Sequence, residues 1–181
     1  MTAAAQDILH FWFEELSDKQ RFAKDPVLDA RMRQRFGATL AAAAAGELST
    51  WRATPVERLA EIIVLDQFSR NIYRDTPAAF AQDAQALTLA QEMVAGGHDQ
   101  ALTVPQRGWA YMPYMHSESL QVHDQVLPLF SQPGLEGTLA FELRHRAILE
   151  KFGRYPHRNA VLARPSSPQE QAFLEQPGSA F

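Results

Sequence analysis

The chain has 181 residues, no cysteine, and 17 Lys and Arg against 21 Asp and Glu, which gives a net charge of −4. This length favours a single domain with a sizeable core, and the lack of cysteine excludes disulfides, zinc-thiolate sites, iron–sulfur clusters and thiol nucleophiles. The mildly acidic balance argues against a general nucleic-acid or membrane-surface binder.

Five positions carry the start signature of a helix, in which a capping side chain precedes a proline. The cap oxygen accepts a bond from an unpaired backbone N–H, and proline has no N–H to leave unpaired. The second and fifth of these starts also have a glutamate at the third helical position, which completes a capping box. In chain order the starts are Asp25-Pro26, Thr54-Pro55, Thr76-Pro77, Thr103-Val104-Pro105 and Ser167-Pro168.

Apolar residues recur at helical spacing between these starts, as Leu28, Met32 and Phe36 do. Only short pieces alternate with a period of two, so no strand is predicted. The sequence predicts an all-α single domain of about eight helices over 1–181, with the residues after 176 frayed. The main predicted helices span 3–16, 26–45, 55–68, 82–95, 117–130, 137–152 and about 168–175.

Turn residues are expected to interrupt or end several of these helices. Gly96 and Gly153 provide stops. Pro113 is expected to form a turn between a short helix and the next one, and Pro128 is expected to end or kink that next helix.

The sequence gives no sign of membrane insertion or export. No run of about 18 apolar residues is present, and the start, Met1 to Asp7, has no basic segment followed by an apolar one. We expect no signal peptide and a cytoplasmic location.

A first polar cluster lies around Asp66. This residue continues the apolar face that carries Ile62 and Ile63, and Arg70 follows four residues later, within ion-pair distance on one helix. One interpretation is a buried strut between Asp66 and Arg70. The other is a pocket wall at which Arg70 or Arg74 meets an anionic ligand, and the two are compatible.

A second cluster is His116-Ser117-Glu118. Ser117 can cap the following helix and place Glu118 at its positive end, which leaves His116 without a structural explanation. A His-x-Glu pair suits acid–base chemistry or a metal, but a metal needs a third ligand. The candidates for that ligand are His123, Asp124 and His145, and we predict neither a metal nor a cofactor.

A third cluster follows the stop at Gly153, where Arg154, His157, Arg158 and Asn159 share a short loop. Planar guanidinium groups suit carboxylate or phosphate, although arginines in a surface turn can simply bind carbonyls. Residues 144–164 hold six Lys or Arg and one Glu, a local charge of +5, so the rest of the chain carries −9. Such a patch is expected to attract small anions or acidic peptide ends.

Taken together and in this order, these motifs resemble a bacterial protein family of unknown function, numbered 924. The resemblance includes Phe11-Trp12-Phe13, the segment from Leu65 to Arg74, Tyr111-Met112-Pro113 with His116-Ser117-Glu118, and the segment from Phe152 to Asn159. The family's usual proline in the Asp-Gln-Phe motif is Ser69 here. The resemblance implies an all-helical, tetratricopeptide-like right-handed superhelix and no particular reaction.

Three functions remain open. In the first, the clusters form a pocket for an anionic small molecule, and His116 or His157 acts as acid or base beside Asp66 or Glu118. The residues expected to hold the anion and line the pocket are Trp12, Arg70, Asn71, Tyr73, Arg74, Trp109, Tyr111, Arg154, Arg158 and Asn159.

The second is a helical scaffold with a groove for a peptide or an acidic chain end. The third is a structural module whose arginines pair internally and bind no ligand. The sequence does not predict an oligomeric state.

Overall fold

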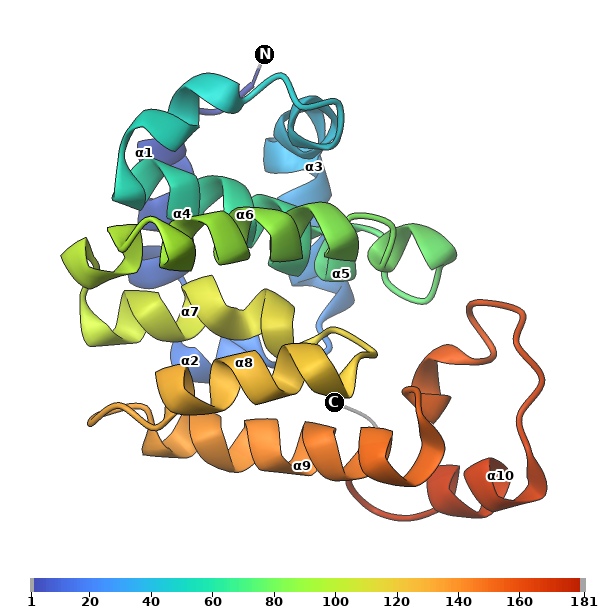
Figure 1. Cartoon of the computed structure of the whole chain (residues 1–181). Coiled ribbons are helices and arrows are strands. Elements are labelled where there is room, and N and C mark those ends of the chain that lie inside the picture. Colours follow the sequence, from blue (N-terminus) through green and yellow to red (C-terminus); the bar gives the residue numbers. More distant parts are fainter. Residues whose placement is uncertain (1, 180–181) are drawn as a thin grey trace.

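The computed structural model describes residues 2–179 and confirms the all-α prediction, with no strand among those residues (Figure 1). The α-helices are α1 (Ala5–His10), α2 (Asp18–Arg21), α3 (Pro26–Ala44), α4 (Pro55–Ile63), α5 (Ser69–Ile72), α6 (Asp83–Ala95), α7 (Val104–Met115), α8 (Leu120–Phe130), α9 (Glu136–Phe152) and α10 (Pro168–Leu174). Short π-helical turns span Phe11–Glu15 and Val64–Phe68, and 3₁₀ turns span Ser49–Ala53, Pro77–Ala79, His98–Ala101 and Pro156–Arg158.

The predicted helix starts at α3, α4 and α10 are confirmed by their capping bonds. The side chain of Asp25 accepts from the N–H of Val27 at 2.9 Å, Thr54 Oγ1 accepts from the N–H of Glu57 at 3.3 Å, and α10 is capped in the same way. Thr76-Pro77 opens only a three-residue 3₁₀ turn. The helix α6 begins six residues after Pro77, at Asp83.

Two expectations about the α7–α8 region are wrong. Pro113 lies inside α7 and forms no turn. Pro128, which was expected to end or kink the next helix, lies inside α8, and that helix ends two residues later at Phe130. Each proline is within three residues of a helix end, where the single lost backbone bond is tolerated more easily than in mid-helix. Ser117 does not cap α8, because that helix begins at Leu120, after Ser119.

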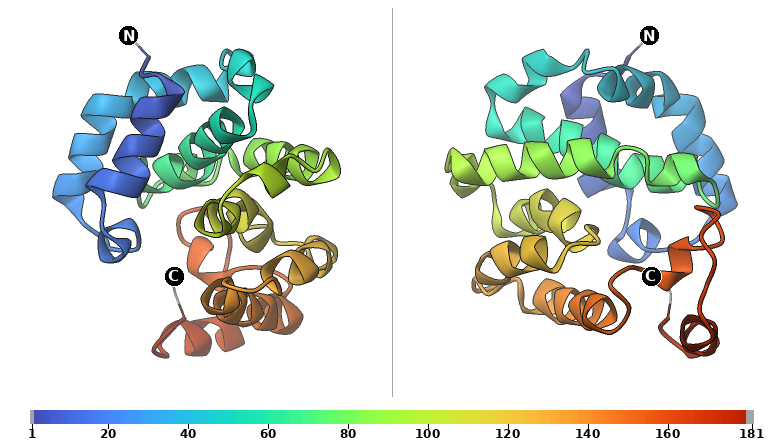
Figure 2. Two further views of the ribbon diagram at one scale, coloured as in Figure 1. Left: turned by 90° about the vertical axis from the view of Figure 1, so that its left-hand side faces the viewer. Right: turned by 45° about the vertical axis from the view of Figure 1, so that its right-hand side comes forward.

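The helices from α4 onward pack in sequence, so that α6 contacts α4, α7 contacts α6, α8 contacts α7, and α9 contacts α8. Figure 1 shows α6, α7, α8 and α9 as successive levels. At the other end, α1 contacts α4, and α3 contacts the turn Val64–Phe68 and α5 (Figure 2). The segment after α9 returns along one side of this stack. The tetratricopeptide-like superhelix stays a prediction.

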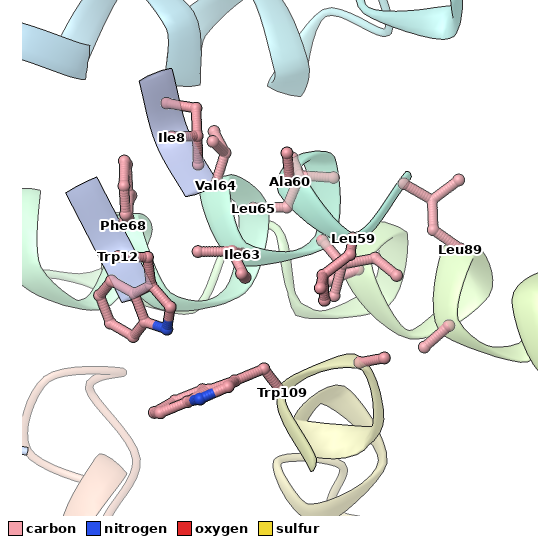
Figure 3. Close-up of a cluster of buried hydrophobic side chains, with 14 of the residues drawn as sticks. Ile8, Trp12, Leu59, Ala60, Ile63, Val64, Leu65, Phe68, Leu89 and Trp109 are labelled. Carbon is pink, nitrogen blue, oxygen red and sulfur yellow. The ribbon is translucent and has the colours of Figure 1, made fainter. Parts of the chain in front are cut away.

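Aromatic side chains occupy the centre of the core, where α1 and its π-helical turn meet α4 and α7 (Figure 3). Phe68 is fully buried, with its ring centroid 5.9 Å from that of Phe11 and 5.1 Å from that of Phe36. Trp12 meets Trp109 edge to face at 5.0 Å. Edge-to-face and tilted pairs at these distances add to the gain from apolar burial.

The segment after residue 176 is only partly described. Ser179 is buried, and its hydroxyl donates to the carbonyl of Leu174 at 3.0 Å. The frayed tail after residue 176 stays a prediction. Residues 180–181 of the predicted frayed tail lie outside the described residues. Within 2–179, every helix is too short or too polar to cross a bilayer.

The aromatic core gives a direct test of the packing. Replacing Phe68 with alanine leaves a cavity among rings that cannot close over it, so we expect the free energy of unfolding to fall by about 3–5 kcal/mol. Urea denaturation measures this change. Phe22→Ala is the matched control, because Phe22 is 68% exposed, and it is expected to cost less than about 1 kcal/mol. Equal losses in the two variants would contradict this description of the core.

Candidate functional site

Asp66, the carboxylate of the first cluster, is only 1% exposed. It lies in the π-helical turn Val64–Phe68, directly after α4, and turns of this kind are frequent at functional sites. Its Oδ1 accepts from His116 Nδ1 at 2.7 Å and lies 3.0 Å from Arg70 Nη1, and its Oδ2 accepts from Gln67 Nε2 at 2.6 Å. The predicted strut between Asp66 and Arg70 is therefore present, and His116 completes it.

The protonation states of Asp66 and His116 follow from this arrangement. Burial alone raises the pKa of Asp66, but the charges of Arg70 and His116 and the hydrogen bonds outweigh it and lower the pKa to about 2. Burial and the Arg70 charge lower the pKa of His116, against the opposing pull of Asp66. Because an ionised Asp66 can only accept, Nδ1 of a neutral His116 carries the proton and Nε2 is an acceptor.

Asp83, at the first turn of α6, joins Arg70 to Arg158. Arg70 donates to both carboxylate oxygens, at 2.8 and 3.0 Å, and Arg158 Nη1 donates to Oδ2 at 3.1 Å. The Arg158 guanidinium lies over the rings of Phe80 and Tyr155 at 4.6 and 4.8 Å. This second salt bridge connects α5 and α6 to the segment that follows α9.

Arg158 is the least satisfied of these cations. Its Nη2 donates to the carbonyl of His116 at 2.9 Å, while Nε is buried and has no hydrogen-bond partner among the described residues. Burial and the nearby charge of Arg70 lower the pKa of Arg158. The guanidinium therefore retains hydrogen-bonding capacity that the protein does not use.

A pocket of about 420 Å³ opens beside these residues. Its apolar part is formed by side chains of the Pro77–Ala79 turn, the start of α6, the end of α7 and the segment after α9. The lining residues are Pro77, Phe80, Ala81, Asp83, Ala84, Leu87, Pro113, His116, Ser117, Glu118, Arg158 and Leu162. Of the site residues predicted from the sequence, the pocket wall contains His116, Glu118 and Arg158, with Asp66 and Arg70 directly behind them.

Glu118 holds the chain that forms the wall. It does not sit at a helix N-terminus as predicted, because α8 begins two residues later. Its Oε1 accepts from the N–H of Tyr155 at 2.7 Å and from Arg164 Nη2 at 2.9 Å, and its Oε2 accepts from Arg164 Nη1 at 2.7 Å. Burial raises the pKa of Glu118, but these hydrogen bonds prevail and lower it.

Arg154 and Asn159 do not reach the pocket. Arg154 donates to both oxygens of Glu170, at 2.7 and 2.9 Å, and Asn159 Oδ1 accepts from Arg164 Nε at 3.0 Å. Both residues brace the segment between α9 and α10. Glu170 lies on α10, and the loop that carries Arg154 and Asn159 folds against this helix. Internal pairing therefore replaces the contact with a ligand that was expected of both residues.

The predicted basic patch is largely neutralised in the same way. Arg146 pairs with Asp124 at 2.6 Å and with Glu150 at 3.1 Å, while Arg154, Arg158 and Arg164 have the partners given above. The charge of +5 over 144–164 therefore does not form a continuous free surface, and the attraction of anions to this segment stays a prediction.

Arg74 and Asn71 form a separate contact, next to Tyr73 in the sequence. Arg74 donates to both carboxylate oxygens of Asp29, at 2.6 and 2.9 Å, and Asn71 Nδ2 donates to Asp29 Oδ1 at 2.8 Å. Tyr73 is 36% exposed. These bonds attach α5 to α3, and none of the three residues lines the pocket.

The aromatic residues expected to form the pocket wall are in the core instead. Trp12 and Tyr111 are fully buried and Trp109 is 8% exposed. The hydroxyl of Tyr111 donates to Asp99 at 2.5 Å. Aromatic residues close to polar motifs in the sequence were expected to share their surface, but successive helical residues point in different directions.

His157, His145 and His123 surround Tyr155 behind the pocket. The rings of His145 and His157 lie 5.6 Å from that of Tyr155, and His123 Nε2 lies 3.2 Å from its hydroxyl. His123 also pairs with buried Glu142 at 2.5 Å. His145 is buried, and His157 does not line the pocket.

No group of three possible metal ligands occurs within residues 2–179.

The sequence did not point to Asp83 and Phe80, both of which line the pocket. Asp83 is 13 residues from Arg70 and 75 from Arg158, so no helical spacing could have connected them.

The buried histidines predict a loss of stability in mild acid. Burial lowers the pKa of His145 to about 3 and that of His157 to about 4, both from 6.5. Below pH 6.5 the unfolded chain therefore binds more protons than the folded chain. Each histidine makes its full contribution to the free energy of unfolding above pH 6.5, and this contribution is lost as the pH falls toward 4. We expect a slope of about 1.4 kcal/mol per pH unit for each histidine, measured by urea denaturation across this range.

His145→Gln and His157→Gln should each flatten this dependence, whereas His10→Gln, at a side chain 59% exposed, should not. Asp66, with its pKa of about 2, contributes only at lower pH. Stability that stays constant from pH 6.5 to 4.5 would contradict the neutral buried histidines.

Comparison with known proteins supports the fold and the family. The model of a family described as bacterial protein of unknown function (DUF924) matches residues 8–178. A solved structure of a protein of unknown function from Agrobacterium tumefaciens is similar, with a TM-score of 0.89 and 36% identity over 94% of this chain and 96% of that chain. A search among curated proteins found no match. The chain therefore belongs to the DUF924 family of bacterial proteins of unknown function.

Proposed function

We propose that the pocket beside His116 binds a small molecule with an anionic group, and that His116 acts on it as a general base. The observation that carries this proposal is the pair formed by His116 Nδ1 and Asp66 Oδ1 at 2.7 Å, located at the wall of a pocket of about 420 Å³. A histidine oriented by a buried carboxylate is a common arrangement for proton transfer.

The state of His116 suits this role. Its lowered pKa keeps the ring neutral near pH 7, and its proton on Nδ1 leaves the Nε2 lone pair as the base. The side chain is 15% exposed and lines the pocket, so a ligand can approach it. Asp66 holds the ring in one orientation and stabilises the imidazolium that forms when Nε2 accepts a proton.

Arg158 is the group expected to meet the anion. It shares Asp83 with Arg70, so two guanidinium groups compete for one carboxylate. Each terminal nitrogen of Arg158 uses one of its two N–H groups, and a carboxylate or phosphate oxygen could accept from the others. The carbonyl of His116 binds the same guanidinium, which places the anion close to the proposed base.

The two alternatives are less well supported. A peptide groove requires free cations along an open surface, but Arg74 and Arg154 are bound in two-point contacts to carboxylates. A purely structural module explains Arg70, Arg74 and Arg154. It does not explain why His116 and Arg158 lie together at an open pocket.

A copurified ligand tests the binding. Native mass spectrometry of the full chain should detect a small anionic molecule, and Arg158→Lys should lose it because lysine cannot reproduce the planar fork. Arg154→Lys is the matched control, because it disturbs an equivalent two-point ion pair away from the pocket, and it should retain the molecule. Equal retention in both variants would place the ligand elsewhere.

Substitution of the base tests the chemistry. For any substrate turned over in a broad screen, His116→Gln should lower kcat by about 10²- to 10⁴-fold, the usual contribution of general acid–base catalysis. Asp66→Asn should also lower kcat, because it allows the other ring tautomer. Thermal unfolding of each variant separates this loss from misfolding. Turnover that persists in folded His116→Gln would remove the base from the proposal.

A further inference from the structure

The polar rim of the pocket offers acceptors as well as donors. Asp83 accepts three hydrogen bonds and Glu118 accepts three, whereas a carboxylate has about four lone-pair sites. His116 Nε2 is a third acceptor. The side chains of Asp83, Glu118 and His116 are 20%, 26% and 15% exposed, so a bound molecule can reach each of them.

The donors at the rim come from Arg158, whose side chain is 8% exposed. Its terminal nitrogens each have one N–H group beyond those given to Asp83 and His116. The rim therefore has one donor group with a positive charge, and it faces three acceptors, two of which are negative.

The formal charges around the pocket cancel. With His116 neutral, three guanidinium groups face three carboxylates; these are Arg70, Arg158 and Arg164 against Asp66, Asp83 and Glu118. A ligand of a single charge is attracted by half of this set and repelled by the other half. A ligand with both charges can place each one beside its opposite, which favours it over either singly charged analogue.

The remaining lining is apolar and consists of Pro77, Phe80, Leu87, Pro113 and Leu162 with two alanines. A volume of about 420 Å³ is within the range of small-molecule sites, about 300–1,000 Å³. This lining suits a compact hydrocarbon group next to the charged end.

We infer that the ligand is a small zwitterion with an apolar body, of the α-amino acid type. Its carboxylate lies toward Arg158, its ammonium group toward Asp83, Glu118 and His116 Nε2, and its side chain against Phe80 and Leu87. The inference rests on the proposed function and narrows it, because it adds a positive group to the anionic one.

Three compounds that share an isobutyl group separate these contributions. L-leucine carries both charges, 4-methylpentanoate lacks the ammonium group, and 3-methylbutylamine lacks the carboxylate. Isothermal titration calorimetry of the full chain near neutral pH should show L-leucine binding more tightly than either analogue, by at least about tenfold. The loss of one charge-assisted hydrogen bond accounts for a tenfold ratio, which is about 1.4 kcal/mol.

A blocking variant locates the binding. Ala84 is exposed on α6 and lines the pocket, so Ala84→Phe fills the pocket without removing an ion pair and should abolish the binding of L-leucine. Ala41→Phe introduces the same change at an exposed position of α3 away from the pocket and should leave the affinity unchanged.

Each other outcome overturns the inference in a different way. If 4-methylpentanoate binds as tightly as L-leucine, the zwitterion is wrong while the proposed anion site stands. If 3-methylbutylamine binds as tightly, the carboxylate is unnecessary and both are wrong. If none of the three binds, or if Ala84→Phe still binds L-leucine, this ligand class is wrong, and the copurified molecule decides the proposed function separately.

Discussion

The buried carboxylate of Asp66 sets the constraint that the surrounding structure satisfies. An isolated charge at 1% exposure is tolerated only with complete pairing. Gln67, Arg70 and His116 supply that pairing. Because His116 is the residue directly after α7, neutralising Asp66 fixes the end of α7 against the turn after α4. Removing one partner would leave a buried charge uncompensated, which is more costly than the contact itself is stabilising.

The same constraint extends to the C-terminal part of the chain. Arg70 pairs with Asp66 and also with Asp83, and Asp83 binds Arg158. One continuous series of ion pairs therefore joins α5, α6 and the segment after α9, and the pocket lies along it. The residues of this series are structural and also candidates for binding, so the strut and the pocket wall are two properties of one arrangement. A substitution at Ala84 therefore tests ligand binding more directly than removal of a charge does, because it leaves every ion pair of this series in place.

Local patterns in the sequence predicted the local features of the structure. Caps at Asp25 and Thr54 and the stop at Gly153 were confirmed, since each depends on neighbouring residues only. The spacing from Asp66 to Arg70 predicted an ion pair that the structure contains. Prolines were harder to interpret, because Pro113 is tolerated near the end of α7, and a proline in the sequence does not reveal how close the helix end lies.

The features that the sequence did not predict depend on contacts between residues far apart in the chain. The pairs Arg158–Asp83 and Arg164–Glu118 span 75 and 46 residues, and helical periodicity carries no information at that range. The local charge of +5 over 144–164 is counted correctly, but it does not form one free positive surface. Acidic residues elsewhere in the chain fold against that segment and pair with most of its arginines. An excess of arginine in one stretch identifies a free anion site only when the partners of each guanidinium are known. Arg158 remains a candidate because its Nε has no partner among residues 2–179 and the residue lines the pocket.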